Sequence, residues 1–373
     1  MILQKLNLIK FRSHVKAGSD FVNGVNLIVG PNGAGKTNIL EAINLLSTGK
    51  SFRAHYDQEM VYNPDIAVME NQTNNAINDD LTQKKFSKVV GSILSDKNEE
   101  TLEILIVKGN PYTNLSQKTF KVNGTPKPIY ETAKYFSTVL FCPQDLDLFN
   151  GSPALRRKFL DNILCTVDPK YKKEHMVYTK AVRQRNKILE KINKTARGGD
   201  ELSFWTDELL KTGTYLQEKR SGLIQTLNNT LGPIYSKISS RAIKVHVDYK
   251  VNHINLERLE KHREHEIYAK TTLVGPHRDD FDFLTNGFSI SHYGSRGQQR
   301  TGVLALKMCE LDVISTTHNA GQNTPNPPVL LLDDIFSELD DAHKKALEAI
   351  VHNQQTIISS THPDIKAQNT LTL

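Results

Sequence analysis

The alternation of apolar and polar side chains predicts strands at the start of the chain. Residues 1–6 mix apolar and polar side chains without a continuous apolar segment, and the first strand is expected to continue to Phe11. A second strand is expected from Phe21 to Val29, after a polar turn that follows Ser13-His14. Apolar residues then recur at helical spacing from Ile39 to Leu46, which predicts an amphipathic helix. A strand, a short loop and a helix therefore follow one another between residues 21 and 46.

The remaining pattern divides into strand-rich and helix-rich parts. Asn123-Gly124 is a hairpin signal, and Gly232-Pro233 is expected to break a helix. The polar stretch 70–85 is expected to be an exposed loop. Further strands are expected at 89–94, 102–107, 118–122, 139–142, 329–332 and 356–361, and helices through most of 144–270. The sequence thus predicts an α/β lobe from residues 1–143 and 271–373, and an inserted, mainly helical lobe from residues 144–270.

Composition and charge narrow the possible classes of protein. The chain has 373 residues and three cysteines without a C-x-x-C pair, which suits a reducing cytoplasm and argues against a disulfide framework. No apolar run approaches the ~20 residues that span a bilayer. The net charge is +6, but residues 151–270 contain 24 Lys and Arg against 14 Asp and Glu. This basic middle indicates either a surface for a polyanion or a solvated helical face, and charge alone does not separate the two.

The loop between the second strand and the first helix carries the most specific motif. Gly30 to Thr37 reads G-P-N-G-A-G-K-T, which fits the phosphate-loop pattern at every fixed position. Its glycines allow backbone N–H groups to approach an anion, and the helix N-terminus adds partial positive charge. Lys36 is expected to reach the β- and γ-phosphates, and the Thr37 hydroxyl is expected to ligate Mg²⁺.

Four later segments fit the same chemistry and follow in a fixed order. Residues 330–334 read L-L-L-D-D, an apolar strand ending in two acids that resembles a Walker B motif. Ser337 to Asp340 reads S-E-L-D, the loop that follows Walker B in ABC-type ATPases. Gly294 to Arg300 is glycine-bracketed and polar, and resembles their signature loop. The strand at 356–361 ends in Thr-His, which fits their switch histidine.

With these motifs the chain resembles the RecF family, bacterial recombination mediator ATPases related to the heads of Rad50 and SMC proteins. The resemblance extends over nearly the whole length. It rests on the segments Phe11-Arg12, Gly30–Ile43, Gly49–Arg53, Phe141–Leu146, Gly151–Pro153, Arg156-Arg157, Gln184–Asn186, Gly275–Asp280, Ser295–Arg300 and Asp333–Asp340. The family fold implied is an ABC-type ATPase head with an inserted helical lobe.

The resemblance assigns ATP, Mg²⁺ and three kinds of site residue. Catalysis is expected of Asp334, which would polarise the attacking water, with Gln144 and His362, and the metal is expected at Thr37, Asp333 and Gln144. Two subunits would face each other, with the signature Ser295 and Gly297 of one closing the nucleotide site of the other. The nucleotide is expected to be bound by Gly30, Pro31, Asn32, Gly33, Ala34, Gly35, Lys36, Thr37, Asn38, Arg12, Ser295, Gly297 and Gln298.

The resemblance also implies DNA as the partner. Proteins of this family bind duplex DNA near single-strand gaps, help to load RecA together with RecR and RecO, and take part in the SOS response. The basic middle region supports contacts to the phosphate backbone, which are independent of sequence and sensitive to salt. The predicted DNA contacts are Arg156, Arg157, Lys158, Arg183 and Arg185. We therefore expect a weak, DNA-stimulated, cytoplasmic ATPase that dimerises on ATP.

Two other classes share part of the motif set. The nucleotide-binding subunit of a membrane transporter has the same ATP motifs, but its function does not require a basic inserted lobe of this size. A P-loop kinase needs neither the signature nor the S-E-L-D segment. Co-purification with membranes would reveal the first, and phosphate transfer to a small molecule would reveal the second.

Overall fold

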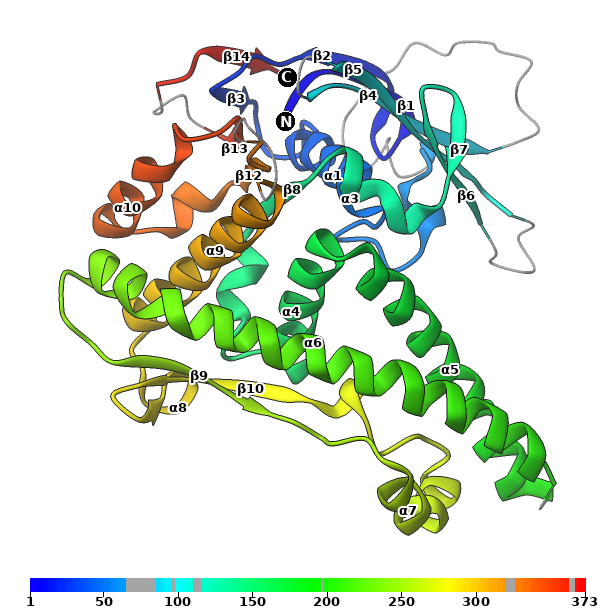
Figure 1. The fold of residues 1–373 in the computed structure, drawn as a ribbon. Coiled ribbons are helices and arrows are strands. Elements are labelled where there is room, and N and C mark those ends of the chain that lie inside the picture. The colour runs from blue at the N-terminus through cyan, green and yellow to red at the C-terminus, as the bar shows by residue number, and fades with distance from the viewer. Residues whose placement is uncertain (65–84, 96–97, 110–115, 196, 320–325, 362–365) are drawn as a thin grey trace. The chain divides into compact units, whose positions relative to one another are not determined.

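The computed structural model describes residues 1–64, 85–95, 98–109, 116–195, 197–319, 326–361 and 366–373 (Figure 1). These residues form two units, of which unit 1 contains Met1–Asp145 and Ile314–Leu373, and unit 2 contains Leu146–Val313. The predicted exposed loop at 70–85 lies outside the described residues except for Lys85. No helix in the described part of the chain is long and apolar enough to cross a membrane.

Unit 1 contains an antiparallel sheet of six strands in the order β2-β1-β4-β5-β6-β7. The Asn123-Gly124 turn joins β6 to β7 with both residues at positive φ, so the predicted hairpin is confirmed. The predicted turn after His14 is wrong, because residues 14–20 form a partly exposed edge strand, which the absence of an apolar run hid from the sequence pattern. The strands are β1 (Ile2–Phe11), β2 (His14–Asp20), β4 (Phe86–Ser95), β5 (Asn98–Val107), β6 (Gln117–Val122) and β7 (Thr125–Lys127).

The second sheet of unit 1 is parallel throughout, with the order β14-β3-β13-β12-β8. Its strands are β3 (Val25–Val29), β8 (Thr138–Phe141), β12 (Val329–Asp333), β13 (Thr356–Ser360) and β14 (Asn369–Thr372). In a parallel sheet the loops after the strands gather at one edge, where ligands of α/β proteins bind. The phosphate loop follows β3, Gln144 follows β8 and Asp334 follows β12, so the sheet brings three predicted motifs to the same edge.

Helix α1 (Lys36–Thr48) packs against strands of both sheets and is buried over most of its length. Its apolar residues join β1, β4, β5, β12 and β13 in one hydrophobic core. Gly49 ends the helix at φ 71° and donates its N–H to the Leu45 carbonyl. The other helical elements of unit 1 are η1 (Asp57–Met60), η2 (Ile129–Glu131), α3 (Thr132–Tyr135), η3 (Pro143–Asp147, which reaches into unit 2), η5 (Ile335–Glu338) and α10 (Asp341–Val351).

Unit 2 is mainly helical, with a three-stranded sheet in the order β11-β10-β9. The predicted helix break at Gly232-Pro233 is wrong, because α6 continues through Pro233. Leu231 and Tyr235 are buried on either side, so packing outweighs the missing N–H of the proline. The elements are α4 (Pro153–Val167), α5 (Pro169–Thr195), α6 (Gly199–Ser239), β9 (Val245–Lys250), α7 (Leu256–Ala269), η4 (Pro276–Arg278), β10 (Asp280–Thr285), β11 (Phe288–Ser289), α8 (Ile290–Tyr293) and α9 (Arg296–Asn319).

The division into units differs from the predicted lobe boundaries. The first boundary lies after Asp145 instead of residue 143, and the second lies after Val313 instead of residue 270. Residues 271–313 belong to unit 2 because β10 pairs antiparallel with β9 over its whole length. Such long-range pairing leaves no mark in the local sequence pattern.

Candidate nucleotide site and predicted DNA contacts

The phosphate loop leads from β3 directly into α1. Gly33 and Gly35 have φ of 84° and 96°, in the left-handed region that L side chains rarely adopt. A Cβ atom at Gly35 would lie 2.6 Å from Nε2 of His14, whereas one at Gly33 would meet nothing within 4 Å. Gly35 is therefore required both by its backbone conformation and by a close neighbour.

Lys36 is held inside this loop. Its ammonium donates to the carbonyl oxygens of Gly30 at 2.6 Å and Pro31 at 3.0 Å, and only 7% of the residue is exposed. The carbonyls orient a buried cation towards the loop. The loop's backbone N–H groups, together with this positive charge, are the groups that would bind a phosphate.

Thr37, Asp333 and Ser359 form a hydrogen-bonded cluster beside the loop. The Thr37 hydroxyl donates to Oδ1 of Asp333 at 2.9 Å, and the Ser359 hydroxyl donates to the same oxygen at 2.8 Å. The cluster joins the phosphate loop, the end of β12 and the end of β13. Its hydroxyl and carboxylate oxygens are the ligands that Mg²⁺ prefers, and a magnesium ion bound to nucleotide needs only one or two protein ligands. The residues therefore fit the ion, although sequence reasoning had missed Ser359.

The backbone around Asp334 is fixed by the same serine. Its N–H donates to Oγ of Ser359 at 3.0 Å, and its φ is 48°. The following loop is closed by Asp340, whose side chain caps α10 by accepting from the His343 N–H at 3.0 Å. Gln144 is exposed in η3 at the same sheet edge. The predicted switch residue His362 lies outside the described residues.

Arg12 is placed differently from the predicted nucleotide contact. Its guanidinium forms a two-pronged ion pair with Glu41, at 2.9 and 2.6 Å, and its third nitrogen donates to the Glu59 carbonyl at 2.9 Å. Glu41 is fully buried and also accepts from the Ser51 hydroxyl. Arg12 thus joins the β1–β2 turn to α1 through a buried carboxylate, and its donors face this carboxylate.

Two further side chains at the loop were not predicted as site residues. His14 approaches the Gly35 carbonyl to 3.3 Å, and burial lowers the pKa of its imidazole. Arg53 is exposed and donates to the side-chain oxygen of Asn38 at 3.1 Å, while Asn38 donates to Ser13 at 2.8 Å. The cation at Arg53 is thereby held at the first turn of α1. Only its position in a loop with two cations hinted at this role.

The signature segment in unit 2 begins helix α9 with a capping box. The backbone N–H of Ser295 donates to the Gln298 side chain at 2.8 Å, and the Gln298 N–H donates to the Ser295 hydroxyl at 3.3 Å. Ser295, Gly297 and Gln298 are all exposed. The side chain of the next residue, Gln299, accepts a hydrogen bond from the Asn150 amide. The segment presents a hydroxyl and a helix N-terminus to solvent.

The five predicted DNA contacts fall into two groups, and three of them are occupied by internal interactions. Arg156 pairs with Asp280 at 2.6 Å and donates to three backbone carbonyls. Arg157 donates to the Asp279 carbonyl at 2.8 Å. Arg185 is 2% exposed and pairs with Glu266 at 2.7 Å, with further bonds to two threonine hydroxyls. We therefore correct the prediction for Arg156 and Arg185, whose charges are neutralised by internal acids, whereas Lys158 and Arg183 are exposed.

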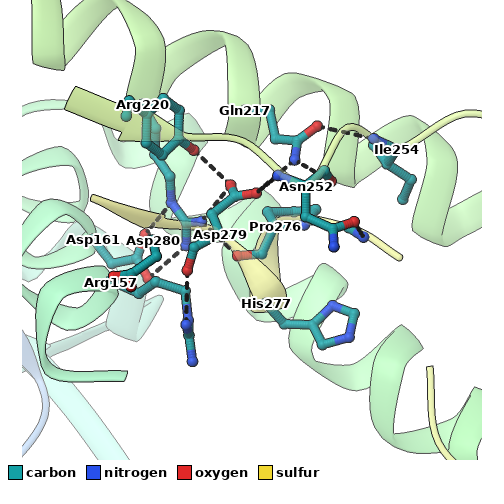
Figure 2. A network of polar contacts seen from close by, with 12 residues as sticks. Arg157, Asp161, Gln217, Arg220, Asn252, Ile254, Pro276, His277, Asp279 and Asp280 are labelled. Atoms are coloured by element: carbon teal, nitrogen blue, oxygen red, sulfur yellow. Dashed lines mark hydrogen bonds and ion pairs between the residues drawn. The ribbon is translucent and has the colours of Figure 1, made fainter. Parts of the chain in front are cut away.

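Figure 2 shows the network that holds Arg157. Arg220 lies at its centre, with contacts to Asp161 at 2.8 Å and to Asp279 at 3.1 Å, and Gln217 donates to the second oxygen of Asp279. Burial alone raises the pKa of Asp161, but the charge of Arg220 outweighs it and holds this pKa well below its usual range. The network ties α4, α6 and the loop before β10 together. Its role is to keep these elements in register.

With this geometry in view, the chain can be compared with known proteins. The RecF/RecN/SMC N terminal domain matches residues 2–371. The DNA replication and repair protein RecF of Lachnoclostridium phytofermentans is 31% identical over 365 residues, which cover 97% of this chain and 93% of that protein. The protein of the same name from Caldanaerobacter subterraneus is 32% identical over 375 residues, with 97% and 94% covered. The chain belongs to the RecF family.

Solved structures agree with this assignment. The recombination mediator protein RecF in the RecFOR pathway, solved as RecF-ATPrS, has a TM-score of 0.84 at 31% identity and covers 100% of this chain and 96% of that one. An Smc head bound to the winged-helix domain of ScpA has a TM-score of 0.50 at 16% identity, with 97% and 90% covered, which shows a shared fold. The predicted fold class, an ABC-type ATPase head with a helical second part, is confirmed.

Proposed function

We propose that this RecF-family chain is an ATP-dependent DNA-binding protein of recombinational repair, in which slow ATP hydrolysis acts as a switch. The observation that carries the proposal is the 2.9 Å hydrogen bond from Thr37 to Asp333. It joins two motifs that are 296 residues apart, and it places a hydroxyl and a carboxylate, the oxygen ligands that suit Mg²⁺, beside the phosphate loop. The ATP-bound structures of relatives support the choice of nucleotide.

Within unit 1, each residue has a distinct role. The loop from Gly30 to Thr37 and Lys36 would cradle the β- and γ-phosphates, with Asn38 and Arg53 at the first turn of the helix. Thr37 and Asp333, with Gln144 nearby on the sheet edge, would hold Mg²⁺, which neutralises phosphate charge when it is bound. Asp334 would orient the attacking water, assisted by Gln144 and His362.

The signature segment would complete the site of a second copy. Ser295, Gly297 and Gln298 present an exposed hydroxyl and helix N-terminus, a group of donors suited to a γ-phosphate. ATP would then link two copies, and hydrolysis would release them, so that nucleotide occupancy sets the fraction of dimer. This makes the chain an ATP-gated clamp and a weak ATPase that DNA stimulates.

The proposed partners follow from the relatives. Proteins named for DNA replication and repair, and structures from the RecFOR pathway, support double-stranded, gapped or single-stranded DNA as the ligand and RecR as the direct protein partner. RecO and RecA would act through RecR, in a cytoplasmic process that includes the SOS response. We assign ATP binding to unit 1, and DNA contact and part of the dimer surface to unit 2.

The decisive experiment is analytical ultracentrifugation of the full chain with and without ATP and Mg²⁺, and with and without gapped duplex DNA. We expect dimer only with ATP. Lys36→Ala should remove ATP binding and dimer together, and Asp334→Asn should bind ATP and keep the dimer after wild-type protein has dissociated. A wild-type chain that remains monomeric with saturating ATP and Mg²⁺ would refute the proposal.

The trans role of Ser295 needs a control for its capping role. Ser295→Arg should keep ATP binding and lose the dimer, but it also removes the cap. Ser295→Asp keeps a good N-cap residue and places a negative charge opposite the γ-phosphate. We expect Ser295→Asp to melt like wild type, bind ATP and fail to dimerise. Dimerisation of Ser295→Asp at wild-type ATP concentrations would contradict the trans contact.

A further inference from the structure

Helix α5 has an unusual charge composition for a helix packed in a folded unit. Between Pro169 and Thr195 it contains nine Lys and Arg against two acids, Glu174 and Glu190. Two of the nine cations, Lys172 and Arg185, are buried, and the others are exposed. The excess positive charge therefore lies on the solvent side of the helix.

The exposed cations are arranged along one face. Lys173, Lys180 and Lys187 are seven residues apart, and Arg183 lies between them, three residues from one and four from the other. In an α-helix this spacing puts all four side chains on one stripe. We call this stripe the α5 cation face. Over 14 residues at 1.5 Å each it is about 21 Å long, which matches about six base pairs of duplex DNA at 3.4 Å each.

None of these four side chains has an ion pair with an acid among the described residues. The Lys180 ammonium lies 5.9 Å from the centre of the Trp205 ring, which is a cation–π contact and not an ion pair. By contrast Lys191 and Lys194, further along, pair with Glu201 and Glu190. Like charges three and four residues apart destabilise a helix by about 0.2–0.5 kcal/mol per pair, and a polyanion bound along the stripe would offset this repulsion.

The opposite side of α5 is already used. Tyr171, Tyr178, Ala181, Ile188 and Leu189 are buried, and α5 packs along α6 in unit 2 (Figure 1). The apolar side therefore cannot enter a lipid bilayer, which a membrane-surface helix requires. A partner of this face meets four cations and the exposed side chain of Met176, which lies between Lys173 and Lys180.

We propose that the α5 cation face binds the phosphate backbone of DNA. The inference rests on the proposed DNA-binding function and names its contact surface. A row of Lys and Arg without base-reading groups gives affinity independent of sequence, released counterions and steep salt dependence. It replaces Arg156 and Arg185, which are paired with internal acids, with three lysines that the sequence prediction omitted, and it keeps Arg183.

The test uses the variant Arg183→Gln/Lys187→Gln in the full chain, with Lys237→Gln/Lys244→Gln as the matched control. The control lysines are exposed in the same unit but lie outside α5, one in the last turn of α6 and one just before β9. Affinity for a labelled 30-base-pair duplex is measured by fluorescence anisotropy between 50 and 200 mM salt, with ATP and Mg²⁺. A single strand of the same length and vesicles containing phosphatidylserine are parallel arms.

Removing two phosphate contacts should lower the slope of log affinity against log salt by roughly 1.8 on duplex DNA. Between 50 and 200 mM salt, wild-type affinity should then fall roughly 12-fold more than that of the variant. The control should keep the wild-type slope, and the variant should keep its melting temperature and its ATP-dependent dimer without DNA. A change of about 0.7 per contact on the single strand would show that both DNA forms use the same face.

The outcomes separate this inference from the proposed function. Equal slopes for wild type and variant, with wild type binding DNA, would overturn the α5 cation face and leave the ATP-gated clamp intact. Binding that depends on α5 in a chain that does not dimerise on ATP would support the face and refute the clamp. Tight binding of wild type to the vesicles that the variant loses would also overturn the assignment to DNA.

Discussion

Arg183 and Arg185 are two residues apart, and the structure predicts opposite consequences for their removal. Arg185 is 2% exposed, and its partner Glu266 is fully buried. Among the described residues, Arg185→Ala leaves the buried Glu266 carboxylate with the N–H of Leu273, at 2.8 Å, as its remaining donor. Breaking a buried ion pair on one side costs about 3–5 kcal/mol of unfolding free energy.

This loss should be easy to measure by calorimetry. For a unit of this size, each kcal/mol lowers the melting temperature by about 2–4 °C, so Arg185→Ala should lower it by about 6–20 °C. Arg183→Ala removes an exposed side chain and should change stability by no more than about 0.5 kcal/mol. In a salt titration with duplex DNA, Arg183→Ala should reduce the slope, and folded Arg185→Ala should keep it.

A double variant tests the physical cause. Arg185→Met/Glu266→Met replaces both charges with apolar side chains, so no buried charge is left unpaired, and most of the lost stability should return. The Thr206, Thr272 and Leu273 partners then limit full recovery. If Arg185→Ala were as stable as Arg183→Ala, or if it lost salt-dependent DNA affinity while folded, the structural interpretation of Arg185 would be wrong.

Three other outcomes follow from local geometry. Gly35→Ala should weaken ATP binding and stability more than Gly33→Ala, because both strain a positive φ but only the first also meets His14; equal effects in calorimetry and ATP titration would contradict this. Burial lowers the pKa of His277 to about 4 in the folded chain, so on acidification the imidazole binds a proton in the unfolded chain at a higher pH than in the folded one. The free energy of unfolding should therefore fall by about 3 kcal/mol as the pH decreases from 6.5 to 4. Urea unfolding across this range should show a smaller fall for His277→Gln. Ser359→Ala breaks a hydrogen bond to the aspartate that ends β12, so it should cost about 1.5–3 kcal/mol and raise the Mg²⁺ concentration needed for ATP binding; unchanged Mg²⁺ titrations would count against the cluster.

The error on Arg185 could have been avoided from the sequence. Ala181, Ile188 and Leu189 lie four residues before and three and four residues after it, so the apolar stripe of the helix includes position 185. The same spacing places Arg156 beside Phe159 and Leu160. A local count of charges ignores which face of the helix carries them, and the period of the apolar positions contains that information.

The sequence alone determined what its short motifs, the phosphate loop and the hairpin, can form and bind. The glycines, Lys36 and Thr37 of the phosphate loop are specified by their spacing, because a loop that wraps a phosphate needs those conformations and donors in consecutive positions. The hairpin at Asn123-Gly124 is specified in the same way. The order of the later motifs was sufficient to indicate the family and its fold.

Only the tertiary structure decided which groups meet. Arg12 is 29 residues from Glu41, and Asp333 is 26 residues from Ser359. The sequence around a charged or hydroxyl side chain does not indicate a partner that is far away in the chain. The parallel sheet and the packing of α1 bring the two side chains together. The boundary after Val313 has the same origin, because β9 and β10 find each other through hydrogen bonds between residues far apart in the chain. Spacing thus determines what a segment can bind, and packing determines whether its side chains are free to bind it.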